Sequence, residues 1–281
     1  MPNTMPQNLR TPGPTPIPVD INEAMSDPMI NHRGPEFGEL IAKTTQQLKQ
    51  VFMTKNDLYI LTASGTGSLE AAIVNTLSPG DRVIAATAGA FGDRFVDMVE
   101  AYGADVKRMD FEWGSPMDPN EIRKVLMAEP EIKAVLVTHN ETSTGVTHPV
   151  EEIAQVVKGE FDKLLLVDAV SSLGCIPLPV DAWDCDMVGT ASQKGFMIPP
   201  GLSFISVSER AWEAQQTAKM PRFYFDLSMA KEYLATGQTP FTPNLSAMYG
   251  LSKALDVLLE EGMENVFGRH SALLLNSPAT T

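Results

Sequence analysis

Short apolar runs recur along the chain and predict buried strands. The four clearest runs are residues 82–86, 134–138, 163–168 and 187–190. A strand with one solvated face alternates apolar and polar residues, whereas a continuous apolar run is typical of a strand covered on both faces. The runs therefore favour a parallel sheet between two layers of helices. We also expect a short strand at 59–61 and an antiparallel strand at 202–207.

Amphipathic stretches between these runs predict helices. Residues 36–52 and a long segment through Leu251 and Leu255 carry apolar side chains at helical spacing. Further helices are expected between the strand at 59–61 and the turn Pro79-Gly80-Asp81, and from Asp93 to Tyr102. The alternation of strands and helices indicates a three-layer α/β/α fold with a mostly parallel sheet.

Composition narrows the class of protein. A net charge of -14 argues against nucleic-acid binding, which needs a basic surface. With only Cys175 and Cys185, we expect neither a disulfide framework nor a Cys-rich metal site. No apolar run approaches the roughly 20 residues that span a bilayer, and no secretory signal opens the chain. We therefore expect a soluble cytoplasmic protein that has no membrane segment and binds no metal.

The chain divides into three parts by composition. Residues 1–20 include Pro12-Gly13-Pro14-Thr15-Pro16 and are too rich in Pro for a helix or an inner strand. We expect an extended arm there that lies on another part of the protein. Residues 21–262 are expected to form the large α/β domain, and residues 263–281 the start of a further helix and a tail.

Polar residues follow the predicted strands at the points where the strands end. They are Ser64, Gly65 and Thr66 after one strand, Thr142 after a second, Asp168 at the end of a third, and Gln193 and Lys194 after a fourth. In open parallel sheets, ligands bind beyond the carboxyl ends of the strands. The sequence therefore predicts a binding site where these residues meet.

Each of these features has a structural interpretation beside the functional one. The turn at Ser64–Ser68 is compatible with an anion seat at a helix N-terminus or with an ordinary capped turn. Asp168 is compatible with a cationic ligand or with a helix cap. Lys194 is either a surface lysine or a desolvated nucleophile with a lowered pKa. His139 and Glu141 suggest acid–base or metal chemistry, but no further ligand follows at metal spacing, which favours a structural role for His139.

Several blocks of sequence, in order, resemble one protein family. They are Pro12-Gly13-Pro14-Thr15, Ser64-Gly65-Thr66-Gly67, Gly89-Ala90-Phe91-Gly92-Asp93-Arg94, His139-Asn140-Glu141-Thr142-Ser143-Thr144-Gly145-Val146, Val167-Asp168-Ala169-Val170-Ser171-Ser172, Ser192-Gln193-Lys194 and Pro199-Pro200-Gly201. They resemble the serine–glyoxylate and alanine–glyoxylate branch of the class V, fold type I, aminotransferases. This resemblance implies pyridoxal 5'-phosphate (PLP) as cofactor and transamination between serine or alanine and glyoxylate or a similar 2-oxo acid.

The resemblance also implies roles for single residues. Lys194 matches the lysine that forms a Schiff base with PLP and later carries the substrate's proton. Asp168 matches the carboxylate that pairs with the pyridinium nitrogen and keeps the ring an electron sink. Phe91 matches the aromatic side chain that stacks on the ring, and Thr142 the hydroxyl near the 3'-oxygen.

The remaining matches concern the cofactor's phosphate. Ser64, Gly65, Thr66 and Gln193 match the residues around it in the same subunit. Either Thr239 or Thr242 matches a residue that reaches the phosphate of the partner subunit, which implies a homodimer with a shared active site.

The length of the chain departs from the family. Members continue past Arg269-His270 with a small C-terminal domain whose arginine grips the substrate carboxylate, and Arg269 is not an obvious substitute. We therefore expect either an aminotransferase with impaired activity or a non-catalytic PLP-binding form. The small domain is expected to be absent.

Two other enzyme classes stay open as alternatives. A PLP-dependent lyase related to cysteine desulfurases usually has His where this chain has Gln193, and neither Cys175 nor Cys185 lies in a convincing nucleophile loop. A nucleotide-binding oxidoreductase built on Ser64–Ser68 would leave Asp168 and Lys194 unexplained. Serine, alanine and ureidoglycine are all compatible amino donors.

Overall fold

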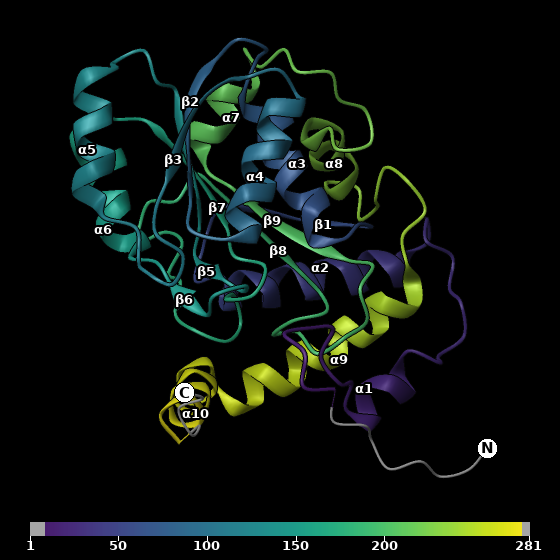
Figure 1. Ribbon diagram of the computed structural model, residues 1–281. Coiled ribbons are helices and arrows are strands. Elements are labelled where there is room, and N and C mark those ends of the chain that lie inside the picture. The colour runs from purple at the N-terminus through teal and green to yellow at the C-terminus, as the bar shows by residue number, and fades with distance from the viewer. Residues whose placement is uncertain (1–8, 277–281) are drawn as a thin grey trace.

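The apolar runs pair into a seven-stranded sheet in the computed structural model, which describes residues 9–276 (Figure 1). The order across the sheet is β1-β9-β8-β7-β4-β2-β3. The strands are β1 (Asp57–Leu61), β2 (Arg82–Thr87), β3 (Asp105–Asp110), β4 (Ala134–Thr138), β7 (Leu164–Asp168), β8 (Met187–Ala191) and β9 (Ser203–Val207). The strands from β8 to β3 pair in parallel, and β9 pairs antiparallel with both β8 and β1. The predicted mostly parallel sheet and its antiparallel strand are confirmed.

Helices cover both faces of this sheet (Figure 1). The longer helices are α2 (Pro35–Val51), α3 (Gly65–Thr76), α4 (Ala90–Ala101), α5 (Pro119–Ala128), α8 (Leu227–Leu234), α9 (Leu245–Glu261) and α10 (Met263–Asn276). Shorter helices are α1 (Val19–Ala24), α6 (Val150–Ala154) and α7 (Glu209–Gln215), and a π-helical turn follows α6 at Gln155–Glu160. Two short strands, β5 (Asn140–Glu141) and β6 (Val146–Thr147), form a separate hairpin.

Two helices begin at other residues than the sequence predicts. The helix expected from Asp93 starts three residues earlier, at Ala90, and the residue before it, Gly89, has no side chain to cap it. Helix α1 begins at Val19, inside the stretch expected to be extended. Within residues 9–276, no helix is long and apolar enough to cross a membrane.

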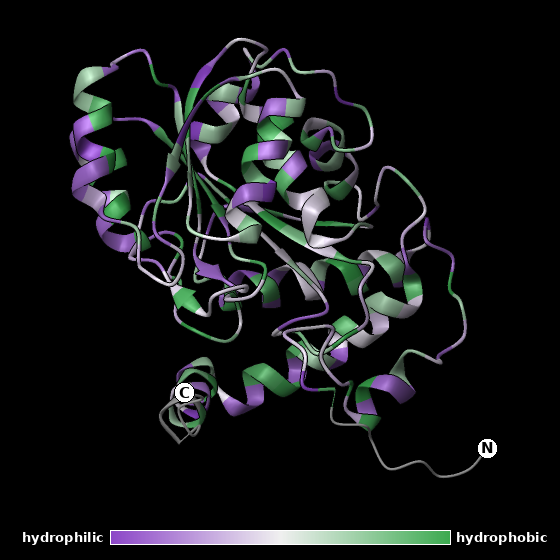
Figure 2. Cartoon of the chain, viewed as in Figure 1, coloured by the Kyte–Doolittle hydropathy of each residue, from purple (hydrophilic) through white to green (hydrophobic). Residues whose placement is uncertain are grey.

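Alternate side chains of each inner strand enter two separate cores. In β4, Val135 and Val137 join the core that contains α2, α5, α6 and α9, whereas Leu136 joins the core formed with α3, α4, α7 and α8. Figure 2 shows the hydrophobic strands at the centre and the hydrophilic outer face of α5. In β7, Leu164 and Leu166 face the α3 and α4 side, so the two-residue period of a strand sends Asp168 to that side as well.

A buried ion pair lies near the amino-terminal ends of β7 and β8. The carboxylate of Asp186 is fully buried and accepts two hydrogen bonds from Lys158 Nζ, both at 2.8 Å. It also accepts from the Leu165 amide at 2.8 Å and from Ser208 Oγ at 2.9 Å. The carboxylate therefore joins the π-helical turn, β7 and the start of α7.

We predict that Asp186→Ala lowers the free energy of unfolding by about 3–5 kcal/mol, because it leaves the ammonium of Lys158 buried without its partner. Asp184 is the matched control, since its carboxylate lies 3.8 Å from the same Nζ but its side chain is 70% exposed. Asp184→Ala is expected to cost less than about 1 kcal/mol. Urea unfolding of both variants measures the difference. Equal decreases in the free energy of unfolding would contradict the prediction that the buried ion pair stabilises the fold more than the exposed one.

Candidate active site

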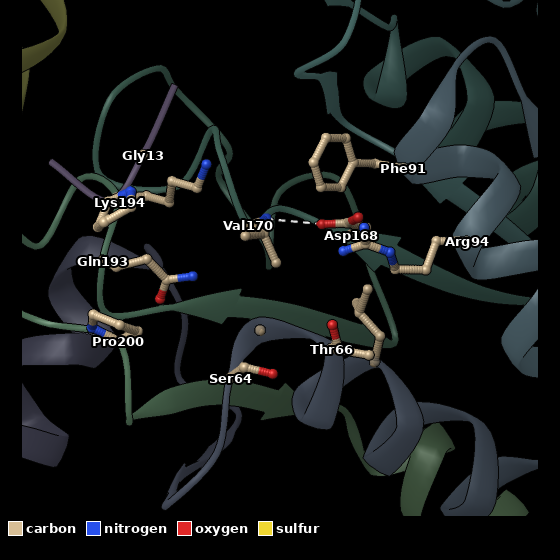
Figure 3. A pocket seen from close by; sticks show the side chains of 13 residues that line it. Gly13, Ser64, Thr66, Phe91, Arg94, Asp168, Val170, Gln193, Lys194 and Pro200 are labelled. Carbon is tan, nitrogen blue, oxygen red and sulfur yellow. Dashed lines mark hydrogen bonds between the residues drawn. The ribbon is translucent and has the colours of Figure 1, made fainter. Parts of the chain in front are cut away.

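A cavity of about 370 Å³ opens at the carboxyl ends of the parallel strands (Figure 3). Its volume lies within the range of roughly 300–1,000 Å³ that is usual for small-molecule sites. The residues that line it are Gly13, Pro14, Ser64, Gly65, Thr66, Leu69, Phe91, Arg94, Asp168, Val170, Gln193, Lys194 and Pro200. Most of the site residues expected from the sequence therefore meet in one place.

One wall of the cavity is the N-terminus of α3. Ser64 precedes the helix, is exposed, and makes no side-chain capping bond. Its hydroxyl is therefore not used as a cap, and the first amides of a helix have no partners inside the helix. Free amides and the positive end of the helix dipole favour an anion. Inside the helix, the hydroxyl of Ser68 donates to Gly65 O at 2.8 Å and to Thr190 O at 3.3 Å, which ties this turn to β8.

Gln193 faces this helix end from the loop after β8. Figure 3 shows its amide nitrogen pointing into the cavity. Its amide oxygen is buried and has no hydrogen-bond partner among the described residues. A buried polar atom without a partner is costly, so a ligand or water that engages this amide would stabilise the site.

Asp168 ends β7 at the bottom of the cavity with a side chain that is almost fully buried. One oxygen accepts from the amide of Val170 at 2.9 Å, but a turn rather than a helix follows, so Asp168 is not a helix cap. Burial raises the pKa of Asp168 to about 7; the charge of Glu141 also raises it, whereas Arg94 and Lys194 lower it. Arg94 and Lys194 act on this carboxylate by their charges, without a direct ion pair among the described residues, and a cationic ligand would stabilise its ionised form further.

Lys194 reaches the cavity from the side opposite Phe91 and Arg94 (Figure 3). It is half-buried rather than a solvated surface residue, and burial lowers its pKa, although the nearby Asp168 opposes this shift. Its ammonium nitrogen donates to Pro12 O at 3.0 Å. A lysine with a lowered pKa has more of the neutral amine that acts as a nucleophile.

The N-terminal arm forms the wall beside this lysine. Thr15 N donates to Gln193 O at 3.1 Å, and Thr15 Oγ1 donates to Lys194 O at 3.2 Å. Gly13 has φ +150°, and a β-carbon there would lie 2.7 Å from Lys194 Nζ. A side chain at position 13 would therefore displace the Lys194 amine from this position, and the positive φ also favours glycine. Sequence reasoning expected the arm to lie on another part of the protein but did not place Gly13 and Pro14 in the site.

Phe91 and Arg94 come from the first turns of α4. The guanidinium of Arg94 lies 4.9 Å from the centre of the Phe91 ring. Residues three apart on a helix are neighbours, so the placement of Arg94 follows once Phe91 is assigned to the site. Arg94 belongs to the sequence motif Gly89–Arg94, but the sequence alone did not predict a role for it in the site.

Three expected site residues do not line the cavity: Thr142, Thr239 and Thr242. Thr142 is half-buried in the turn after β5. The side chain of Thr239 donates to Phe241 O at 2.8 Å, and Arg33 holds the carbonyls of Thr239 and Pro240 at 2.6 and 3.1 Å. Thr242 is exposed. Their roles stay predictions.

The other reactive residue types lie outside this cavity. Burial lowers the pKa of His139 to about 4, and its ring packs edge-on against Trp183 at 5.8 Å. Burial raises the pKa of Cys175 to about 11 and that of Cys185 further. Among residues 9–276, no group of three or more His, Cys, Asp or Glu side chains is placed to hold a metal ion.

A family model that covers nearly the whole chain identifies its family. Residues 20–275 match the family model described as Aminotransferase class-V. The chain is 45% identical over 268 residues to the soluble hydrogenase small subunit of Synechococcus sp., covering 95% of this chain and 70% of that protein. It is 40% identical over 275 residues to the serine–glyoxylate aminotransferase of Methylorubrum extorquens, covering 95% and 68%.

Comparison with a solved structure supports the same family. The alanine–glyoxylate aminotransferase from Nostoc sp. superposes with a TM-score of 0.92 at 34% identity, covering 98% of this chain and 74% of that one. The chain therefore spans about 70% of the length of these relatives.

The raised pKa of Asp168 predicts how stability depends on pH in the cofactor-free protein. The folded state binds the proton of the Asp168 carboxyl more tightly than the unfolded state does. The protonated carboxyl therefore contributes to the free energy of unfolding below about pH 4, and this contribution is lost as the pH rises to about 7. Asparagine does not titrate, so Asp168→Asn abolishes this pH-dependent loss of stability. We expect the variant to gain stability relative to the wild type between pH 4 and pH 8.

Urea unfolding at pH 4, 6 and 8 measures this gain. The exposed Asp97→Asn on α4 is the matched control. A difference between Asp168→Asn and the wild type that stays constant over this range would contradict the prediction.

Proposed function

The chain belongs to the class-V aminotransferases, which are PLP enzymes, and on this premise we propose that it transfers an amino group from serine or alanine to glyoxylate or a similar 2-oxo acid. One observation carries the proposal. An anion seat, a buried carboxylate and a desolvated lysine converge on one cavity. The names of the Methylorubrum and Nostoc relatives support the substrates.

The residues of the cavity fit PLP. The α3 amides, the hydroxyls of Ser64 and Thr66, and the amide nitrogen of Gln193 supply donors for a phosphate. Asp168 supplies the carboxylate for a protonated ring nitrogen, and Phe91 supplies an aromatic face. When bound, PLP withdraws electrons from the substrate's Cα and so permits loss of its proton.

Two residues move or hold protons in this proposal. With PLP in the cavity, Lys194 Nζ would hold it covalently, and as a free amine it would take the proton from the substrate's Cα and deliver it to the cofactor. The lowered pKa of Lys194 favours the neutral form that this step requires. Asp168 accepts the hydrogen bond of a protonated ring nitrogen. That cation would lower the pKa of Asp168 from about 7 and keep the residue ionised.

The lyase alternative receives less support from the cysteines. Cys175 lines a smaller cavity of about 150 Å³ that also touches Lys194. Burial raises its pKa to about 11, which leaves little thiolate at neutral pH. Arg269, which lines the same small cavity, pairs with both oxygens of Glu261 at 2.8 and 3.0 Å. A residue for the substrate carboxylate is therefore not assigned within this chain.

We further propose a homodimer in which Thr239 or Thr242 reaches the partner's phosphate seat. Exposed aromatic side chains support this assembly: Phe223 is 69% exposed and lies 5.6 Å from the ring of Phe241, beside these threonines. Sedimentation is expected to give twice the 30.5 kDa chain mass, and Phe223→Asp is expected to shift the protein toward monomer. A monomeric wild type would contradict the assembly.

A cytoplasmic location is also proposed. The acidic composition and the two unpaired cysteines, Cys175 and Cys185, suit a reducing compartment. Fractionation of cells that express the full chain tests this proposal, and recovery in an exported fraction would contradict it.

We predict that the PLP-loaded chain converts serine and glyoxylate to hydroxypyruvate and glycine. Lys194→Ala is expected to lower the rate by about 10²–10⁴-fold, because it removes the group that moves the proton. The exposed Lys219→Ala is the matched control and should keep the wild-type rate. Glycine is quantified by chromatography. A wild type that binds PLP but forms no glycine would instead support the non-catalytic form.

A further inference from the structure

Glu141 is a buried carboxylate behind the cavity that the proposed chemistry does not use. It lies in β5, has no exposed surface, and faces the N-terminus of α4. One carboxylate oxygen accepts from Gly92 N at 3.0 Å and from Phe91 N at 3.2 Å. The other accepts from Ser143 N at 3.0 Å and from Ser143 Oγ at 2.6 Å.

This carboxylate replaces the missing cap of α4. The residue before the helix is Gly89, which has no side chain to cap it. Together, Glu141 and Ser143 meet the first three amides of the helix, because Ala90 N donates to Ser143 Oγ at 3.1 Å. A negative charge at a helix N-terminus is favourable, and a buried charge requires such partners.

Gly89 shows how closely the two segments fit. A β-carbon on Gly89 would lie 2.4 Å from Glu141 Cγ and 2.5 Å from Glu141 Cδ. The absence of a side chain at Gly89 thus makes room for the carboxylate. The cap is therefore built from two matched positions that lie about fifty residues apart in the chain.

The helix turn that Glu141 caps carries two cavity residues. The amide of Phe91 is bonded directly to the carboxylate, and Arg94 lies one turn further along. Both side chains line the cavity opposite Lys194 (Figure 3). Thr142, expected near the cofactor's 3'-oxygen, lies between the two capping residues in sequence. A shift of this turn would move Phe91 relative to Asp168 and Lys194.

We propose that Glu141 is a positioning residue of the cofactor site, which acts through the α4 N-terminus to fix the Phe91 ring against bound PLP. The inference rests on the proposed function and deepens it. Its negative charge also reaches Asp168, whose pKa it raises. The negative charge of Glu141 adds to that of Asp168 and so favours a protonated ring nitrogen beside Asp168.

The test compares Glu141→Gln with the wild type in the full chain. Glutamine keeps the shape and one acceptor oxygen but loses the charge. Apparent Kd for PLP, from quenching of protein fluorescence, is expected to rise about tenfold, the size expected when charge-assisted hydrogen bonds become neutral ones. The circular dichroism of the cofactor's absorption band, which reports the orientation of the ring, is expected to weaken.

Asp118→Asn is the matched control. Asp118 caps α5 by accepting from Asn120 N at 2.8 Å, and α5 packs against the other face of the sheet. This variant loses a cap charge far from the cavity, so its Kd for PLP should equal that of the wild type. A similar rise in Kd for Asp118→Asn would show a general effect of destabilisation and overturn the proposal.

A double-mutant cycle with Phe91→Leu tests the route of the effect. If Glu141 acts through Phe91, Glu141→Gln should raise Kd much less in the Phe91→Leu background than in the wild type. Equal increases in both backgrounds would overturn the proposal. If Glu141→Gln does not fold, Ser143→Ala serves instead, because it removes one donor to the carboxylate and one acceptor for the Ala90 amide.

Ser143→Ala is expected to raise Kd about threefold, as for one neutral hydrogen bond, and an unchanged Kd would overturn the proposal. These outcomes are separate from failure of the proposed function. If the wild type shows no PLP band, the proposed function fails. If the wild type binds PLP and Glu141→Gln binds it equally well, only the role of Glu141 fails.

Discussion

A carboxylate that ends a buried strand sets the conditions for the rest of the site. Asp168 follows four apolar residues of β7, and the two-residue period of the strand directs it toward α3 and α4. The Val170 amide satisfies only part of it, and its pKa rises to about 7 as a consequence of burial. Such a group is stable as a carboxylate only when a cation comes close. The cavity therefore presents this carboxylate to a cationic group of a ligand.

The sheet topology brings the other anchors to this carboxylate. Strands β7 and β8 pair in parallel, so Asp168 and the loop with Gln193 and Lys194 lie at the same edge. Strand β1 runs toward that edge too, because the antiparallel β9 separates it from β8. The turn at Ser64 therefore opens α3 beside the other two loops. One antiparallel strand inside a parallel sheet thus places the anion seat next to the lysine.

Much of this arrangement follows from local sequence, and the remainder follows from contacts between distant segments. The apolar runs predicted the inner strands because burial on both faces leaves a continuous pattern. Strand β3 was missed since it lies at an edge, pairs only with β2, and carries the charged sequence Asp105–Asp110. Asp168 and Lys194 stood out because a charged residue after an apolar run is unusual. The function of Glu141 as a cap depends on the approach of β5 to α4, which no local pattern encodes.

The central claim is that this cavity seats PLP with Lys194 as its covalent anchor. Borohydride reduction of the PLP-loaded chain, followed by mass mapping of its peptides, tests it most directly. One pyridoxyl phosphate group per chain is expected, on the peptide that contains Lys194. A modification that is spread over surface lysines, or that is absent from Lys194 while the protein stays folded, would contradict the account.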